Sequence, residues 1–115
     1  MSRIWKAFGY SINGIISTFK SEIAFRQDVF IFIIGAAAAF LIPVGALETG
    51  LLISSLFFIL FAELVNTAIE VIVNRISEAR HPLSGKAKDI GSALVLLSFI
   101  NAAIVWSAIL FSVSH

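Results

Sequence analysis

The sequence contains no cysteine, so disulfide bonds, thiol nucleophiles and cysteine metal sites are excluded. Charge is also scarce. Only 13% of the 115 residues are Asp, Glu, Lys or Arg, whereas soluble domains carry about 25%. The formal net charge is +1, which argues against a nucleic-acid partner, because binding to phosphate backbones needs a clear basic excess. Any chemistry must come from a few carboxylates, amides and basic side chains.

Hydrophobic residues are abundant: they make up 59% of the chain, and the mean hydropathy is +1.01. A globule of this size cannot bury so many apolar residues away from water. The solvent for most of the chain must therefore be lipid. Three stretches have the roughly 20 apolar residues that a membrane helix needs. They are residues 29–47, 51–73 and 90–113. We therefore predict an all-α membrane protein, with residues 1–115 forming one domain.

The first stretch, residues 2–20, is interrupted by basic residues and is not expected to span the membrane. At 100° per residue its apolar side chains gather on one arc and its polar side chains on the other. The apolar arc contains Ile4, Trp5, Phe8, Ile12, Ile15, Ile16 and Phe19. This pattern predicts an amphipathic helix lying on the membrane surface.

All eight Lys and Arg residues fall on one side of this topology, four before the first span and four between the second and third spans. By the positive-inside rule, this side is cytoplasmic. The N-terminus and the second loop are therefore expected in the cytoplasm, with access to ATP, and the C-terminus on the opposite side.

Two carboxylates, Glu63 and Glu70, interrupt the second apolar run. A charge at the centre of a membrane helix costs about 2.5 to 3.5 kcal/mol, so such residues are candidates for function. Together with Asn66 they are spaced by three or four residues and share one helix face. Glu63 and Glu70 lie about 10 Å apart along the helix axis, so the two carboxylates cannot bind one ion together. The alternative is a role in interhelical hydrogen bonding, which is the interpretation we favour for Asn101 in the third span.

Two features near the membrane boundary suit phosphate chemistry. Glu22 is expected at the level of Glu70, where two carboxylates can share Mg²⁺ with phosphate oxygens, although a solvated surface charge is an equal alternative for Glu22. Residues 83–89 form a polar loop with Lys86 and Lys88, and Ser84 is a possible helix N-cap there. The loop lacks the GxxxxGK[ST] pattern of P-loop enzymes.

Residues 63–70, ELVNTAIE, resemble the signature of the prokaryotic diacylglycerol kinase family, which are small integral-membrane lipid kinases. The resemblance extends to residues 22–27 upstream and 83–93 downstream, in the same order and spacing. It covers nearly the whole chain, and its signature fixes four polar identities within an apolar helix.

The resemblance implies a homotrimer in the cell inner membrane that transfers the γ-phosphoryl group of MgATP to diacylglycerol, giving phosphatidic acid. It implies that Glu63 is the general base and that Glu22 and Glu70 are Mg²⁺ ligands. The implied ATP-binding residues are Arg3, Tyr10, Glu22, Asn66, Glu70, Lys88 and Asp89. The implied lipid-binding residues are Ala24, Phe25, Arg26, Gln27, Asp28, Glu63 and Ser92. We expect the surface helix and basic loop of one protomer to meet the second span of another.

The chain departs from the family pattern at Asn74, where the family usually has Asp, and any role of that carboxylate is in doubt here. The nearest alternative function is an undecaprenol kinase of the same family. The Glu22 region, residues 83–93 and the full third span favour diacylglycerol. An alternative of another class, an oligomeric ion or proton pathway through Glu63 and Glu70, leaves the basic loop without a function.

Overall fold

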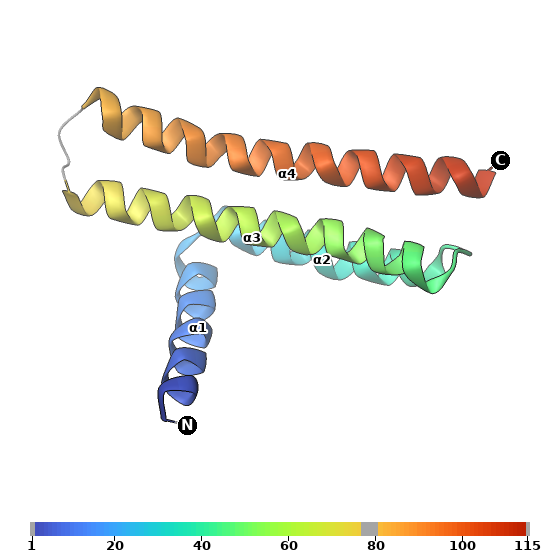
Figure 1. Ribbon diagram of the computed structural model, residues 1–115, viewed down its shortest axis with the longest axis horizontal. Coiled ribbons are helices and arrows are strands. Elements are labelled where there is room, and N and C mark those ends of the chain that lie inside the picture. Colours follow the sequence, from blue (N-terminus) through green and yellow to red (C-terminus); the bar gives the residue numbers. More distant parts are fainter. Residues whose placement is uncertain (1, 77–80, 115) are drawn as a thin grey trace.

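The computed structural model describes residues 2–76 and 81–114, and in these ranges the chain forms four α-helices. They are α1 (Ser2–Ser21), α2 (Ile23–Leu41), α3 (Ala46–Ile76) and α4 (Pro82–Ser114). Figure 1 shows α2, α3 and α4 running along a common direction, whereas α1, in blue, projects away from them. The prediction of an all-helical chain with three long apolar helices is confirmed.

The three long helices are each long and apolar enough to cross a membrane. These features indicate a multi-pass membrane protein. Helix α3 has 31 residues and α4 has 33, whereas about 20 helical residues cross the hydrocarbon core. Both helices are therefore long enough to extend several turns beyond the core.

The ends of the helices differ from the predicted spans, and prolines explain both main differences. The first span was placed at residues 29–47, but α2 begins at Ile23 and ends at Leu41. Pro43 disfavours the helical conformation of the residue before it. Ile42 accordingly adopts an extended conformation, with φ −78° and ψ 131°.

The predicted basic loop is helical instead, because α4 begins at Pro82 and includes residues 83–89. Proline suits the first position of a helix, where its missing N–H has no intrahelical partner. The cap is His81, whose Nδ1 accepts a hydrogen bond from the Leu83 backbone N–H at 3.1 Å. The prediction of Ser84 as the N-cap was wrong.

Helix α3 lies between the other two long helices and packs against both, while the backbones of α2 and α4 do not approach each other closely within the described residues. One apolar cluster consists of the buried Ala39, Leu52 and Ile109. A second consists of Leu56, Ile59 and Ala102. The chain therefore forms an open row of helices, and many large apolar side chains on the outer faces stay exposed.

A polar contact also joins α3 to α4 inside this apolar packing. The Trp106 indole Nε1 donates a hydrogen bond to Ser55 Oγ at 3.1 Å, and Ser55 Oγ donates to the Leu52 carbonyl at 2.7 Å. Ser55 is 3% exposed. Since lipid tails offer no competing partners, this contact fixes the rotation of the two helices about their axes.

We expect Ser55→Ala to lower the free energy of unfolding by about 1 kcal/mol, because the buried indole N–H loses its acceptor. The measurement is the unfolding equilibrium in one detergent. Ser54→Ala is the matched control, since Ser54 is exposed and has no hydrogen bond among the described residues. Equal losses in the two variants would contradict a stabilising role for the Trp106 contact.

Candidate functional site

The chain turns sharply between α1 and α2 at Glu22, which has an extended backbone with φ −114° and ψ 113°. Arg26 in α2 fixes this turn. Its Nη1 donates to the backbone carbonyls of Phe19 at 2.7 Å and Lys20 at 3.0 Å, which lie at the C-terminal end of α1. The carbonyls at a helix end lack intrahelical partners, so the guanidinium acts as a cap supplied by the next helix. This capping role was not predicted, and the predicted contact of Arg26 with lipid stays a prediction.

Glu63 of α3 meets a second carboxyl group, that of Asp28 in α2. Both side chains are buried, with 7% and 6% of their surfaces exposed. The two carboxyl groups lie within hydrogen-bonding reach of each other, and a bond between them requires a proton on one. The buried Oδ2 of Asp28 has no hydrogen-bond donor among the described residues. Asp28 was predicted as part of the lipid site, and the structure brings it to the candidate base.

One helical turn further along α3, Asn66 holds the second carboxylate of the stripe. Its Nδ2 donates to Glu70 Oε1 at 3.0 Å, and both side chains are half-buried. The spacing of four residues places them on neighbouring turns of one face, as the sequence predicted. Glu63, Asn66 and Glu70 therefore form a polar stripe that begins beside α2 and runs toward the end of α3.

Helix α4 contributes to the same region through its close approach to Asn66. Gly91 is buried, and its α-carbon faces Asn66 Oδ1, so that a β-carbon at this position would overlap that oxygen. Lys88 and Asp89 precede Gly91 by three and two residues and are exposed, as is Ser92. Within the described residues, neither Lys88 nor Asp89 forms a hydrogen bond or ion pair with the stripe.

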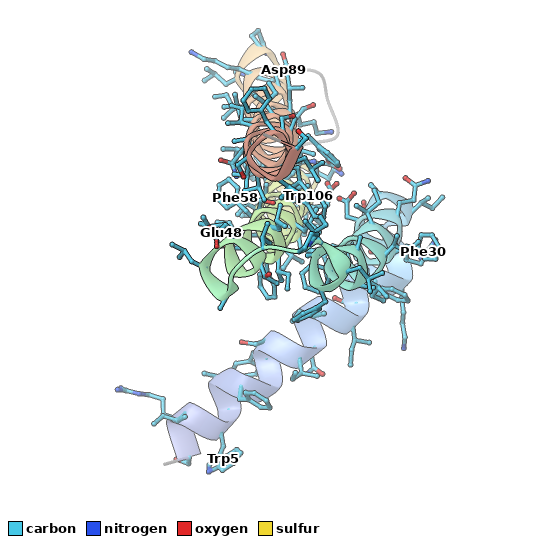
Figure 2. The ribbon with its side chains drawn as sticks, turned by 90° about the vertical axis from the view of Figure 1, so that its right-hand side faces the viewer. Trp5, Phe30, Glu48, Phe58, Asp89 and Trp106 are labelled. Carbon is cyan, nitrogen blue, oxygen red and sulfur yellow. The ribbon has the colours of Figure 1, made fainter. Side chains whose placement is uncertain are left out.

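Of two predicted ATP-site residues, Arg3 lies near the free end of α1, whereas Tyr10 lies midway along the helix, next to Ser11 of the groove between α1 and α3. Both are exposed. Figure 2 shows Trp5, near the free end of α1, on the opposite side of the view from Asp89 of α4. Helix α1 meets α3 only through its C-terminal half, where a groove of about 550 Å³ is lined by residues such as Gly14, Thr18 and Thr67. Within the described residues, neither Arg3 nor Tyr10 forms a hydrogen bond with Asn66.

The predicted metal ligands can be tested by their donor chemistry. Glu22 is half-buried and accepts a hydrogen bond from Ser21 Oγ at 3.2 Å. No group of three or more Asp, Glu or His side chains in residues 2–76 and 81–114 is arranged to hold a metal ion. Glu22 and Glu70 each supply the carboxylate oxygens that Mg²⁺ prefers, since Mg²⁺ usually binds one or two carboxylates and completes its shell with water and phosphate oxygens.

Several other predicted residues are placed by the structure without a contact that reveals a role. Ala24 and Gln27 are exposed on α2, while Phe25 is 3% exposed and packs inward. Asn74 is exposed on α3. Of its possible cationic neighbours, Arg75 is exposed and Arg80 lies outside the described residues.

The contact of Asp28 with Glu63 and that of Gly91 with Asn66 were not predicted from the sequence, although the sequence carries a signal for each. Asp28 stands at the start of an apolar run and needs a polar partner once it is buried, and Glu63 is the carboxyl that supplies it. An isolated glycine within a helical pattern, such as Gly91, often marks a close packing contact.

Comparison with known proteins agrees with this geometry. Residues 9–110 match the family described as prokaryotic diacylglycerol kinase. The chain is 42% identical over 111 residues to the diacylglycerol kinase of Escherichia coli strain K12, covering 96% of this chain and 91% of that protein. It is 41% identical to the diacylglycerol kinase of Pseudomonas aeruginosa, covering 96% and 89%. It is 43% identical to that of Haemophilus influenzae, covering 89% and 86%.

These matches extend over nearly the whole chain and include both the stripe on α3 and the start of α4. The resemblance noted from residues 63–70 is therefore confirmed. The chain belongs to the prokaryotic diacylglycerol kinase family.

Proposed function

We propose that this protein transfers the γ-phosphoryl group of ATP to the primary hydroxyl of diacylglycerol, giving phosphatidic acid. The observation that carries the proposal is the buried stripe of Glu63, Asn66 and Glu70 within an apolar helix of a family member. The names of the similar proteins support diacylglycerol as the substrate.

The two carboxylates of the stripe suit the two substrates of a phosphoryl transfer, the acceptor hydroxyl and the nucleotide. Glu63 is the general base: its carboxylate takes the proton of the lipid hydroxyl as the oxygen attacks the γ-phosphorus of ATP. Asp28 holds the Glu63 carboxyl in place through their contact. Glu70 lies about 10 Å further along the helix axis, so it faces the nucleotide rather than the lipid hydroxyl.

The reaction also needs neutralisation of the phosphate charge. Mg²⁺, when bound, supplies most of this, and Glu22 and Glu70 are the residues that would hold it. The Asn66 amide keeps the Glu70 carboxylate oriented. Lys88 is exposed in the second turn of α4 and is available to the phosphates.

The membrane arrangement follows from the distribution of charge and apolar surface. We place the basic ends of α3 and α4 in the cytoplasm, at the inner membrane, because all Lys and Arg residues fall on that side. Helix α1 lies in the interface. Its apolar arc is exposed in the single chain, with Ile4 69% and Trp5 66% exposed, and lipid would cover it.

We propose a homotrimer in which sites form between copies. The single chain is open, because within the described residues the backbones of α2 and α4 flank α3 without approaching each other closely. A groove of about 470 Å³ runs between them, lined by residues including Gly35, Leu56 and Ala102. Within the described residues, Arg3 and Tyr10 form no hydrogen bond with the stripe of their own copy, and we assign them to the nucleotide site of a neighbouring one.

The test offers labelled ATP and two lipids, diacylglycerol and undecaprenol, in parallel to the purified protein in mixed micelles. We expect the label in phosphatidic acid. Label in undecaprenyl phosphate alone would assign the chain to the alternative substrate of the family. No transfer to either lipid, together with ion flux through reconstituted protein, would contradict kinase activity altogether.

We expect Glu63→Gln to lower kcat by about 10² to 10⁴-fold, because Gln keeps the shape of the side chain but cannot accept the proton. Binding of MgATP should be retained, since Gln keeps the shape of the side chain and the proposed Mg²⁺ ligands are Glu22 and Glu70. Glu48→Gln in the first turn of α3 is the matched control and should retain activity. Near-normal turnover of Glu63→Gln would remove it as the base.

The contact of Asp28 with Glu63 makes a separate prediction. Asp28→Asn should keep most of the activity, because its amide donates a hydrogen bond to the Glu63 carboxylate. Asp28→Ala should lower kcat by about tenfold or more, since the base is no longer held in its productive orientation. Initial rates at saturating ATP distinguish the variants. Equal activity of the two would show that Asp28 does not orient Glu63.

A further inference from the structure

Gly91 occupies a point where α4 approaches a residue of the candidate site on α3. A β-carbon built on Gly91 would overlap Asn66 Oδ1 and would lie 3.3 Å from Asn66 Cγ. Most other glycines in the described residues have open space in this direction, among them Gly9, Gly14, Gly50 and Gly85. Gly91 therefore leaves the space that the Asn66 amide occupies, and no positive φ angle calls for a glycine there.

The Asn66 amide is held along both of its edges. Its Nδ2 donates to Glu70 Oε1 at 3.0 Å. Its Oδ1 is buried, has no hydrogen-bond partner among the described residues, and lies where a side chain at position 91 would begin. A Cα–H of Gly91 points toward this oxygen, an arrangement that recurs as a weak hydrogen bond where helices pack closely. The amide therefore has its donor edge directed at Glu70.

An alanine at position 91 leaves two ways to relieve the overlap. The Asn66 side chain rotates away, which breaks or bends its hydrogen bond to Glu70. Alternatively, α4 moves away from α3, which carries Lys88 and Asp89 away from the stripe. In the first case the Glu70 carboxylate loses its present arrangement, and in the second case the first turns of α4 do.

We propose that Gly91 is a positioning residue for phosphoryl transfer, which acts through the Asn66 amide to hold the Glu70 carboxylate in the orientation that binds Mg²⁺. This inference rests on the proposed function, because the role of Glu70 as a metal ligand belongs to it. Gly91 itself touches neither substrate nor metal. Its contribution is the absence of a side chain.

The test is Gly91→Ala in the full-length protein in one detergent. The half-saturating Mg²⁺ concentration should rise about fivefold, the change expected from loss of one hydrogen bond. Mn²⁺ binding in the presence of a non-hydrolysable ATP analogue, followed by EPR, should weaken by a similar factor without turnover. The KM for diacylglycerol should stay within about twofold, because Glu63 lies further along the helix than the disturbed contact.

Two glycine variants separate this effect from general packing. Gly35→Ala creates the same kind of overlap, with Leu56, within the apolar packing of α2 and α3. It should lower the melting temperature and leave the Mg²⁺ response unchanged. Gly50→Ala meets no atom within 4 Å and should leave both quantities unchanged. A shift in Mg²⁺ response in Gly35→Ala equal to that in Gly91→Ala would overturn the proposal.

A double variant shows whether Gly91 acts through Asn66. In the Asn66→Ala background the amide is gone, so Gly91→Ala should fold and add no further loss of Mg²⁺ affinity. An additive loss would overturn the proposal. If Gly91→Ala alone does not fold, Asn66→Ala should restore folding, and failure to do so would equally contradict a clash with Asn66.

Glu70→Ala separates failure of this inference from failure of the proposed function. Unchanged Mg²⁺ and Mn²⁺ binding in Glu70→Ala would contradict the metal assignment. The NMR resonance of the Asn66 side-chain amide then still decides on Gly91: in Gly91→Ala it should move in the same direction as in Glu70→Ala. An unmoved resonance would show that Gly91 does not set the Asn66–Glu70 contact.

Discussion

Hydrocarbon cannot hydrogen-bond to protein, so every polar side chain in a membrane helix must find its partner within the protein. The contact between Asp28 of α2 and Glu63 of α3 is the main consequence of this constraint here. Both side chains are nearly inaccessible. Their contact fixes which faces of α2 and α3 meet, and it buries the carboxyl group of Glu63, the proposed base, inside the protein.

The Asp28–Glu63 contact is continued by further polar contacts, toward the end of α3 on one side and toward the N-terminus on the other. Toward the end of α3, the same stripe carries Asn66 and Glu70, and Gly91 lets α4 approach the amide that joins them. Toward the N-terminus, Arg26 lies two residues before Asp28 and caps the end of α1. Short, local contacts therefore link all four helices to one polar region.

The sequence predicted what depends on periodicity along a single helix. Three apolar helices, the common face of Glu63, Asn66 and Glu70, and the family are all borne out. Predictions from the sequence failed for helix ends, which proline sets, and for contacts between helices, which depend on how each helix is rotated about its axis. Pro43 and Pro82 set helix ends that hydropathy alone placed elsewhere. The contacts of Asp28 and Gly91 depend on how neighbouring helices turn about their axes, which no spacing within one helix encodes.

The central claim is that Glu63 acts as a base for direct attack of the lipid hydroxyl on ATP. A single in-line displacement inverts the configuration at phosphorus, whereas a phosphorylated-enzyme intermediate gives two inversions and net retention. The most direct test uses ATP made chiral at its γ-phosphorus by oxygen isotopes, with analysis of the phosphatidic acid formed. We predict inversion. Retention would show that a side chain, of which Glu63 is the first candidate, acts as a nucleophile and carries the phosphoryl group. That result would contradict this account.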